Sequence, residues 1–296
     1  MAIYSISDLE KISGIKAHTI RIWERRYKII APKRTATNIR YYSDEDLKRL
    51  LNISALCQNG FKISKVADLD DAQIKDRVVD LSLDIRNQNI QIDGLVVSMI
   101  EMDELKFIEI LTNSVIKLGF EETVESILFP FLERIGVLWQ AGSIYPAQEH
   151  FISNLIRQKL VVANDSEMGR SKKGKTRIMF FLPEGEFHEL SLLFYSFIAR
   201  KENLDVLYLG ASVPINDLVQ VDGTRPIQML FTSFVTSHGE DRFSDVVSRL
   251  VQHFGDRTIF VTGLQIKESH IPLPYQFKVI RSIADFKNCL NEFKGY

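Results

Sequence analysis

The sequence predicts a multidomain protein in which two mainly α-helical parts precede an α/β domain. Three observations support this fold class: helix caps beside a strand-like pair near the N-terminus, a central stretch with helical apolar periodicity, and a C-terminal alternation of strand-like and helical segments. The chain has 296 residues, enough for two or three domains. The expected domains cover residues 1–70, 71–165 and 175–296.

The composition is that of an ordinary globular protein, with 45% hydrophobic and 25% charged residues. No apolar run reaches the roughly 18 residues of a membrane helix, and the N-terminus lacks a basic region followed by an apolar one. We therefore expect a cytoplasmic protein without a membrane partner. Cys57 and Cys289 lie far apart with no Cys or His at metal-ligand spacing, which argues against a disulfide framework or a zinc site.

The net charge of −1 conceals a strongly basic segment. Residues 16–40 carry eight basic side chains against one acidic one, a net of +7, so the other 271 residues carry −8. A compact basic segment in an otherwise acidic chain is typical of phosphate binding, because neutralised phosphates release counterions. On charge alone, a solvated basic face is an equally good interpretation.

Local signals delimit two helices near the N-terminus. Ser5 and Asp8 form a capping box that opens the first helix, and Gly14 ends it. Ser43 and Asp46 form a second capping box, which opens a helix that stops near residue 60.

A helix predicted over residues 17–27 has two different faces. The apolar face carries Ile20, Trp23 and Tyr27, and the cationic face carries His18, Arg21 and Arg25. Residues 32–42 place turn-prone residues between two strand-like ends, which predicts a short basic hairpin. Together these elements predict an all-α winged helix-turn-helix, whose second helix enters the major groove of DNA.

The run from Thr19 to Tyr27, followed by Pro32, Arg34-Thr35, Arg40 to Ser43 and Asp46-Leu47, closely resembles the DNA-binding domain of the MerR family of transcriptional regulators. The resemblance implies that one group of side chains contacts operator DNA: His18, Thr19, Arg21, Arg25 and Tyr27 on the helix, and Arg34, Arg40 and Tyr41 on the wing. Trp23 is expected in the core. Lys16 stands where many relatives place a capping Ser, so the helix has a weaker cap or donors that phosphate satisfies.

The middle segment, residues 71–165, repeats apolar residues at helical spacing with few breakers. Four or five helices of this kind fit a four-helix-type antiparallel bundle. Pro130 lies inside the pattern and predicts a kink, and residues 142–146 predict a turn into the last helix.

That turn is bracketed by Trp139 and the pair Glu149-His150. Composition alone favours a core aromatic and a solvated helix face. The spacing Trp-x9-Glu-His, however, resembles the motif of light-sensing cobalamin-dependent regulators of the CarH and LitR type. This resemblance implies that Trp139 caps the upper face of the corrin and, with Glu149, packs against the adenosyl group. Gln140 stands where the best-known members have a His ligand, and an amide cannot replace an imidazole on cobalt.

Residues 165–175 are polar and rich in Gly, Ser and Lys, which predicts a linker. Beyond it, strand-like runs at 177–183, 204–210, 227–234, 258–263 and 277–280 alternate with helical stretches at 189–201, 216–220, 242–254 and 283–293. This alternation predicts an α/β doubly wound parallel sheet, Rossmann-like and of the flavodoxin type. Such sheets bind ligands at the carboxyl ends of their strands.

The loop after the first of these strands resembles the Asp-x-His-x-x-Gly element of cobalamin-binding Rossmann domains. The resemblance implies that His188 is the lower cobalt ligand and that Glu186, in place of Asp, orients its other ring nitrogen. Ser191 stands where that element has Gly.

Two further cofactor elements match in part. Ser233 and Val235 fit the Ser-x-Leu element loosely, and Gly263 matches the first residue of a Gly-Gly pair. Leu264 replaces the second glycine and could obstruct the groove for the nucleotide tail.

The leading hypothesis is therefore a DNA-binding transcriptional regulator, not an enzyme, that binds double-stranded operator DNA as a homo-oligomer, a dimer or tetramer. Its bundle and Rossmann module would sense a cobalamin. The resemblance implies that adenosylcobalamin favours the oligomer and DNA binding, and that light reverses both. The alternative is the same regulator with a degenerate, cofactor-free sensor used for oligomerisation or protein partners. A third hypothesis, a cobalamin-carrying enzyme module like that of methionine synthase, lacks room for a substrate barrel.

Overall fold

The computed structural model describes residues 4–35, 37–82, 88–140, 144–168, 176–236, 240–268 and 272–294. The chain forms two compact units, Met1–Ile152 and Ser153–Tyr296. The division into three domains stays a prediction, because compactness alone separates two units. Within the described ranges, no helix is both long and apolar enough to span a membrane.

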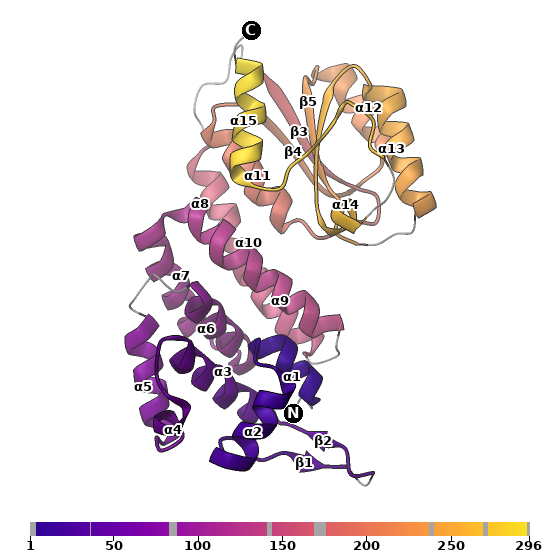
Figure 1. The fold of residues 1–296 in the computed structure, drawn as a ribbon. Helices are drawn as coiled ribbons and strands as arrows, with labels where there is room; N and C mark the ends of the chain where they lie inside the picture. The colour runs from indigo at the N-terminus through magenta and orange to yellow at the C-terminus, as the bar shows by residue number, and fades with distance from the viewer. Residues whose placement is uncertain are drawn as a thin grey trace. The chain divides into compact units, whose positions relative to one another are not determined.

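The first unit begins with the predicted helix-turn-helix and hairpin (Figure 1). Its elements are α1 (Ile6–Ser13), α2 (Ala17–Tyr27), β1 (Lys33–Arg34), β2 (Arg40–Tyr41), α3 (Asp44–Gln58) and α4 (Ile63–Val66). Both capping boxes are confirmed, with the Ser5 and Ser43 hydroxyls accepting from backbone N–H groups three residues on. Gly14 ends α1 in the left-handed conformation, at φ 71°, and β1 pairs antiparallel with β2.

A contact that no local pattern predicts anchors the hairpin. Tyr4 forms an isolated antiparallel bridge with Tyr42, directly after β2, and both tyrosines are fully buried. The Tyr4 hydroxyl also donates to Asp44 Oδ1 at 2.9 Å, at the start of α3. The base of the hairpin is thereby attached to the N-terminal segment and to α3.

The remaining helices confirm the helical middle segment. They are α5 (Asp71–Ser82), α6 (Gln88–Glu101), α7 (Glu104–Leu118), α8 (Phe120–Thr123), the π-helical turn η1 (Val124–Leu128), α9 (Phe129–Gln140) and α10 (Pro146–Ser166). Gly142 and Ser143 of the predicted turn lie outside the described residues, as do residues 169–175 of the predicted linker. Helix α10 continues to Ser166, so the first two residues of the predicted linker are helical.

The predicted kink at Pro130 corresponds to a change of helix type. Proline has no N–H, so it cannot donate to the carbonyl four residues earlier. The chain forms the π turn η1 directly before it, and the Phe129 N–H donates to the Val124 carbonyl five residues back. The helix thus continues through Pro130 with one residue inserted into its repeat.

The second unit contains a five-stranded parallel sheet with strand order β4-β3-β5-β6-β7. Its elements are β3 (Arg177–Pro183), α11 (Leu190–Lys201), β4 (Asp205–Val213), α12 (Ile215–Thr224), β5 (Met229–Ser233), α13 (Glu240–Phe254), β6 (Thr258–Thr262), α14 (Leu264–Glu268), β7 (Phe277–Val279) and α15 (Ile283–Lys294). This order is the flavodoxin-type arrangement, which confirms the predicted sheet. Helix α14 was not expected from the sequence.

Helices cover both faces of the sheet: α11 and α15 lie on one side, α12 and α13 on the other (Figure 1). On the first side, Phe231 stacks against Phe180 at 4.9 Å between ring centroids and contacts Tyr195 of α11 and Phe286 of α15. On the other side, Met179 and Phe181 join the apolar residues of α12 and α13. The strands are therefore apolar on both faces, as buried parallel strands must be.

Candidate functional site

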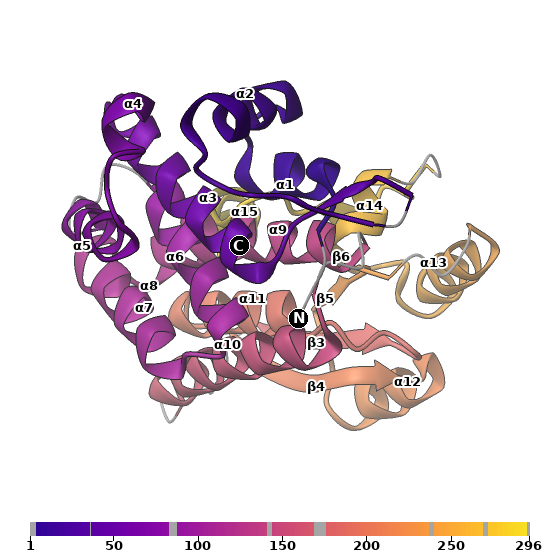
Figure 2. The ribbon, with the colours of Figure 1, turned by 90° about the horizontal axis from the view of Figure 1, so that it is seen from below.

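The cationic face of α2 is exposed, as predicted. Ile20 is fully buried and Trp23 is half-buried, so they hold the helix against the unit. His18, Arg21 and Arg25 are exposed on the opposite side. Helix α2 and the β1–β2 hairpin lie side by side at one end of the first unit (Figures 1 and 2). This end presents exposed cations on a buried apolar support.

The N-terminus of α2 is capped by a residue of the preceding helix. Lys16 makes no side-chain capping bond within the described part of the chain. Instead, Glu10 of α1 accepts a hydrogen bond from the Ala17 backbone N–H at 3.0 Å and pairs with Lys16 Nζ at 3.1 Å. The Ala17 and Lys16 contacts hold the pKa of Glu10 below its usual range. The cap is therefore already filled by a carboxylate, so α2 does not need a phosphate there.

Two of the wing cations predicted to contact DNA also have partners in the hairpin and its support. Arg34 Nη1 donates to Asn38 Oδ1 at 2.7 Å, across the hairpin turn. Arg40 Nε lies 3.7 Å from Glu24 Oε2 of α2. Arg34 and Arg40 thus shape the wing, in addition to any contact they make with DNA.

Glu24 connects α2 with the base of the wing. Its carboxylate is largely buried and accepts a hydrogen bond from the Tyr42 hydroxyl. Burial and this hydrogen bond raise the pKa of Tyr42. Thr19, Tyr27 and Tyr41, the other predicted DNA contacts, are half-buried.

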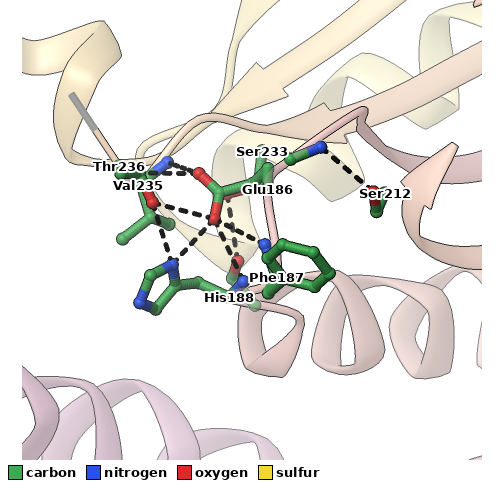
Figure 3. Close-up of polar contacts among 9 residues, drawn as sticks. Glu186, Phe187, His188, Ser212, Ser233, Val235 and Thr236 are labelled. Carbon is green, nitrogen blue, oxygen red and sulfur yellow. Dashed lines mark hydrogen bonds and ion pairs between the residues drawn. The ribbon is translucent and has the colours of Figure 1, made fainter. Parts of the chain in front are cut away.

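In the second unit, Glu186 lies in the loop after β3, at the carboxyl edge of the sheet. The side chain is buried, and six hydrogen bonds converge on its two oxygens (Figure 3). The donors are the backbone N–H groups of Phe187, His188, Val235 and Thr236, the Thr236 hydroxyl and the His188 ring. The longer arm of Glu, compared with Asp, carries the carboxylate to the loop that follows β5.

These hydrogen bonds determine the charge of Glu186. Burial alone would raise the pKa of this carboxyl group. The hydrogen bonds from the His188 ring and from the backbone N–H groups of Thr236, His188 and Val235 outweigh burial and hold the pKa well below its usual range. Glu186 is therefore an anion that can only accept hydrogen bonds.

Glu186 fixes one nitrogen of the His188 ring, as the sequence predicted. Nδ1 of His188 lies 2.7 Å from Glu186 Oε1 and 3.1 Å from Thr236 Oγ1. Because the carboxylate can only accept, Nδ1 is the donor in this hydrogen bond. The His188 side chain is 62% exposed. The carboxylate thus fixes the orientation of an exposed imidazole ring.

Thr236 and Ser212 are parts of this loop cluster that the sequence did not reveal. The pairing of β3 with β4 shifts register near its end, which lengthens β4 and brings Ser212 to the loop. Ser212 Oγ accepts from the Gly185 N–H at 3.0 Å, and the Ser212 N–H donates to the Glu186 carbonyl. A Thr placed just beyond strand β5 could have been suspected from the topology, whereas the register shift leaves no sequence signal.

The other residues of the predicted cofactor elements at this edge of the sheet differ in burial and in contacts. Ser191, in the first turn of α11, donates to Ser233 Oγ at 3.2 Å, and Ser233 is fully buried. Gly263 has φ 111°, and a Cβ there would lie 2.2 Å from the Phe234 carbonyl oxygen, so only glycine fits. Leu264 is the first residue of α14 and is 46% exposed.

The upper-face residues predicted from the Trp-x9-Glu-His motif lie in the first unit. Trp139, near the end of α9, is 47% exposed and is therefore not a core residue. His150 Nδ1 lies 2.7 Å from Glu149 Oε2, on the first turns of α10. The side chain of Gln140 lies outside the described part of the structure.

Two family models match parts of the chain that lie before the Glu186 loop. Residues 4–73 match the family model for the MerR HTH family regulatory protein, and residues 91–163 match the B12 binding domain. The HTH-type transcriptional repressor CarH of Myxococcus xanthus is 29% identical over 259 residues, 84% of each chain. The repressor CarA of the same organism is 27% identical over 269 residues, 89% of this chain and 87% of CarA.

The fold also has a counterpart among solved structures. The monomethylamine corrinoid protein of Methanosarcina barkeri superposes with a TM-score of 0.50 and 14% sequence identity. The match covers 76% of this chain and 100% of that one. At this identity the likeness concerns the fold alone.

Proposed function

We propose that this chain, a CarH/CarA-type regulator in which a MerR HTH region precedes a B12-binding domain, binds operator DNA under the control of cobalamin. The relatives are named as repressors, so repression is the sign that we propose. The observation that carries the proposal is the pairing of the exposed His188 ring with the buried Glu186 anion at the carboxyl edge of a parallel sheet.

The donor set at this edge fits a cobalt ligand. Imidazole suits late first-row transition metals, and a second group that holds the other ring nitrogen fixes both tautomer and orientation. Here Glu186 and Thr236 hold Nδ1 of His188, so Nε2 is the atom that would coordinate. When bound, cobalamin would supply the cobalt centre and, in its adenosyl form, a light-cleavable cobalt–carbon bond.

We further propose which other residues serve the cofactor. On the first unit these are Trp139, Glu149 and His150, and on the second unit Ser191, Ser233, Val235 and Gly263. The exposure of Trp139 supports this role, since a core residue could not reach a ligand. Ser191 is half-buried and donates a hydrogen bond to the buried Ser233 at this edge of the sheet.

DNA binding is assigned to the exposed end of the first unit. We propose that α2 contacts the major groove and its phosphates through His18, Thr19, Arg21, Arg25 and Tyr27, and that the wing holds flanking phosphates through Arg34, Arg40 and Tyr41. The exposure of Arg21 and Arg25 supports a direct contact. The chain would bind as a homodimer or tetramer and would have no catalytic activity.

The cofactor is tested by loading and separation. The purified chain is incubated with adenosylcobalamin in the dark and passed through a sizing column, where corrin absorbance should comigrate with the protein. His188→Ala should lower retention by at least about tenfold, because the imidazole that would hold the cobalt is removed. His253→Ala, an exposed histidine on α13, is the matched control and should retain the corrin.

The same column reads the assembly state in the dark and after illumination. A smaller particle after illumination would support the adenosyl form and the light response. If no corrin comigrates with the wild-type chain, the cobalamin proposal is wrong, and the cofactor-free sensor takes its place.

A further inference from the structure

The side chain of Arg134 joins three helices of the first unit. It lies on α9 and donates from Nη1 to Asp93 Oδ1 of α6 at 2.5 Å. From Nη2 it donates to the backbone carbonyl of Ile12 on α1. The Arg134 and Asp93 side chains are only 18% and 11% exposed. Asp93 and Arg134 fall within the B12-binding match, and Ile12 falls within the MerR HTH match.

The Ile12 carbonyl is a position where a cation has a strong effect. It belongs to the last turn of α1, whose carbonyls have no partner inside the helix. A guanidinium there satisfies the carbonyl and faces the negative end of the helix dipole. Only residues 14–16 separate α1 from α2, so a change in the orientation of α1 also changes the orientation of the recognition helix α2.

Asp93 holds the guanidinium in place. A buried carboxylate without its cation is costly, so the pair stays closed once formed. The planar fork of Arg can serve the carboxylate and the carbonyl together, whereas a Lys ammonium acts as a single point charge.

Two other ion pairs lie in the same part of the first unit, and only the first of them joins the two matched regions. Lys48 Nζ of α3 lies 3.6 Å from Glu101 Oε1 of α6, and Arg49 pairs with Asp71 of α5. Glu101 and Asp71 are 33% and 82% exposed, against 11% for Asp93, so water screens these two pairs more than the Arg134 pair. Arg134 is therefore the main polar connection between the DNA-binding helices and the bundle among these pairs.

We infer that Arg134 is the positioning residue that couples the B12-binding region to the recognition helix. Helix α9 carries Arg134 in its middle and the exposed Trp139 one residue before its end. A shift of α9 on cofactor binding moves the Ile12 carbonyl, and with it α1 and α2. This inference rests on the proposed function, in which Trp139 contacts the cofactor.

The test compares Arg134→Gln with Lys48→Gln in the full-length chain. The DNA probe is a duplex that the wild-type chain has selected from a random pool in the dark with adenosylcobalamin. For each variant, the ratio of DNA dissociation constants without and with adenosylcobalamin measures the coupling. Arg134→Gln should bring this ratio at least about fivefold closer to one, with corrin retained, and Lys48→Gln should keep it within about twofold of the wild type. Arg134→Lys should lie between them.

A wild-type ratio in Arg134→Gln would overturn the inference, as would a ratio of one in a wild-type chain that retains the corrin. A wild-type chain that retains no corrin instead indicates failure of the proposed function. The contact of Arg134 with the Ile12 carbonyl of α1 is then tested by amide hydrogen exchange without cofactor. Residues 6–27 should exchange faster in Arg134→Gln than in Lys48→Gln, and equal exchange would show that Arg134 does not hold α1.

Discussion

The DNA-facing surface of α2 and the cluster around Glu186 use charge in opposite ways. Arg21 and Arg25 are exposed cations on the same face of a single helix. Glu186 is a buried anion held by donors from two loops, up to 50 residues apart in sequence. An exposed charge costs little to keep and is free to meet a partner, whereas a buried charge is stable only with all its donors in place. Substitutions of Arg21 or Arg25 should therefore change binding alone, and substitutions of Glu186 should change stability as well.

The largest effect is expected for Glu186→Ala. Removing the carboxylate leaves four backbone N–H groups without their acceptor, and each such loss costs about 1–3 kcal/mol when the donor stays buried. We expect the free energy of unfolding of the second unit to fall by about 4 kcal/mol. Denaturant unfolding followed by far-UV circular dichroism measures it, with the exposed Glu184→Ala as control. A loss below about 1 kcal/mol would show that the cluster is not a stability element.

Arg21→Ala should come next, acting on DNA binding only. The loss of one groove contact costs about 1–3 kcal/mol, or roughly thirtyfold in affinity, and lowers the salt slope by about one. The free energy of unfolding should stay within about 0.5 kcal/mol. Fluorescence anisotropy at several salt concentrations measures this, and Lys75→Ala on α5 is the exposed control. Equal affinity of Arg21→Ala and wild type would contradict the assignment of α2.

Arg40→Ala tests whether a cation of the DNA-binding surface also contributes to stability. Its guanidinium lies beside Glu24, so its removal should weaken DNA binding and also destabilise the wing, each by about 1 kcal/mol. Thermal unfolding and DNA titration of the same variant separate the two. A pure binding effect would show that the Glu24 contact contributes nothing to the wing.

Acid should affect the second region through Glu186. Its pKa in the folded state lies below its ordinary value of about 4.5, so its contribution to stability is complete above that pH. The contribution is lost as pH falls below about 4.5 toward the folded-state pKa, with a slope of up to about 1.4 kcal/mol per pH unit. Unfolding of the wild type and of Glu186→Gln between pH 6 and 3 should show a steeper acid loss for the wild type. Parallel curves would mean that Glu186 does not carry the charge assigned to it.

The smallest effect is expected for Ser191→Gly. The lost Ser191–Ser233 hydrogen bond should cost about 1 kcal/mol of stability, and corrin retention should change by less than about threefold. Equilibrium dialysis in the dark measures the retention. A large gain would show that Ser191 obstructs the cofactor edge, as the glycine in cobalamin-binding domains suggests.

How far the sequence predicted these regions depends on the distance between the interacting residues. The capping boxes of Ser5 and Ser43 act within one turn of helix, so their residues predict them directly. Strand alternation likewise predicted the five strands and their parallel order, because short crossovers allow few topologies. The pairing of His188 with Glu186 spans two residues and could be inferred from the loop motif.

Other features depend on contacts that no local pattern records. Thr236 reaches Glu186 only because β3 and β5 are neighbours in the sheet. The Glu10 cap of α2 and the bridge of Tyr4 to Tyr42 likewise require the tertiary fold.

The π turn before Pro130 also sets the direction in which the side chains of α9 point. Each residue in an α-helix advances the side-chain direction by about 100°, so the extra residue of η1 rotates everything after it by that amount around the axis. Deleting one residue from Val124–Leu128 would turn Arg134 away from Ile12 and Trp139 away from its present direction together. Pro130 has no N–H and cannot donate to the carbonyl four residues earlier, so the side chains after η1 keep this rotated direction. The five residues of η1 thus set the directions of Arg134, which contacts α1, and of Trp139 at the other end of α9.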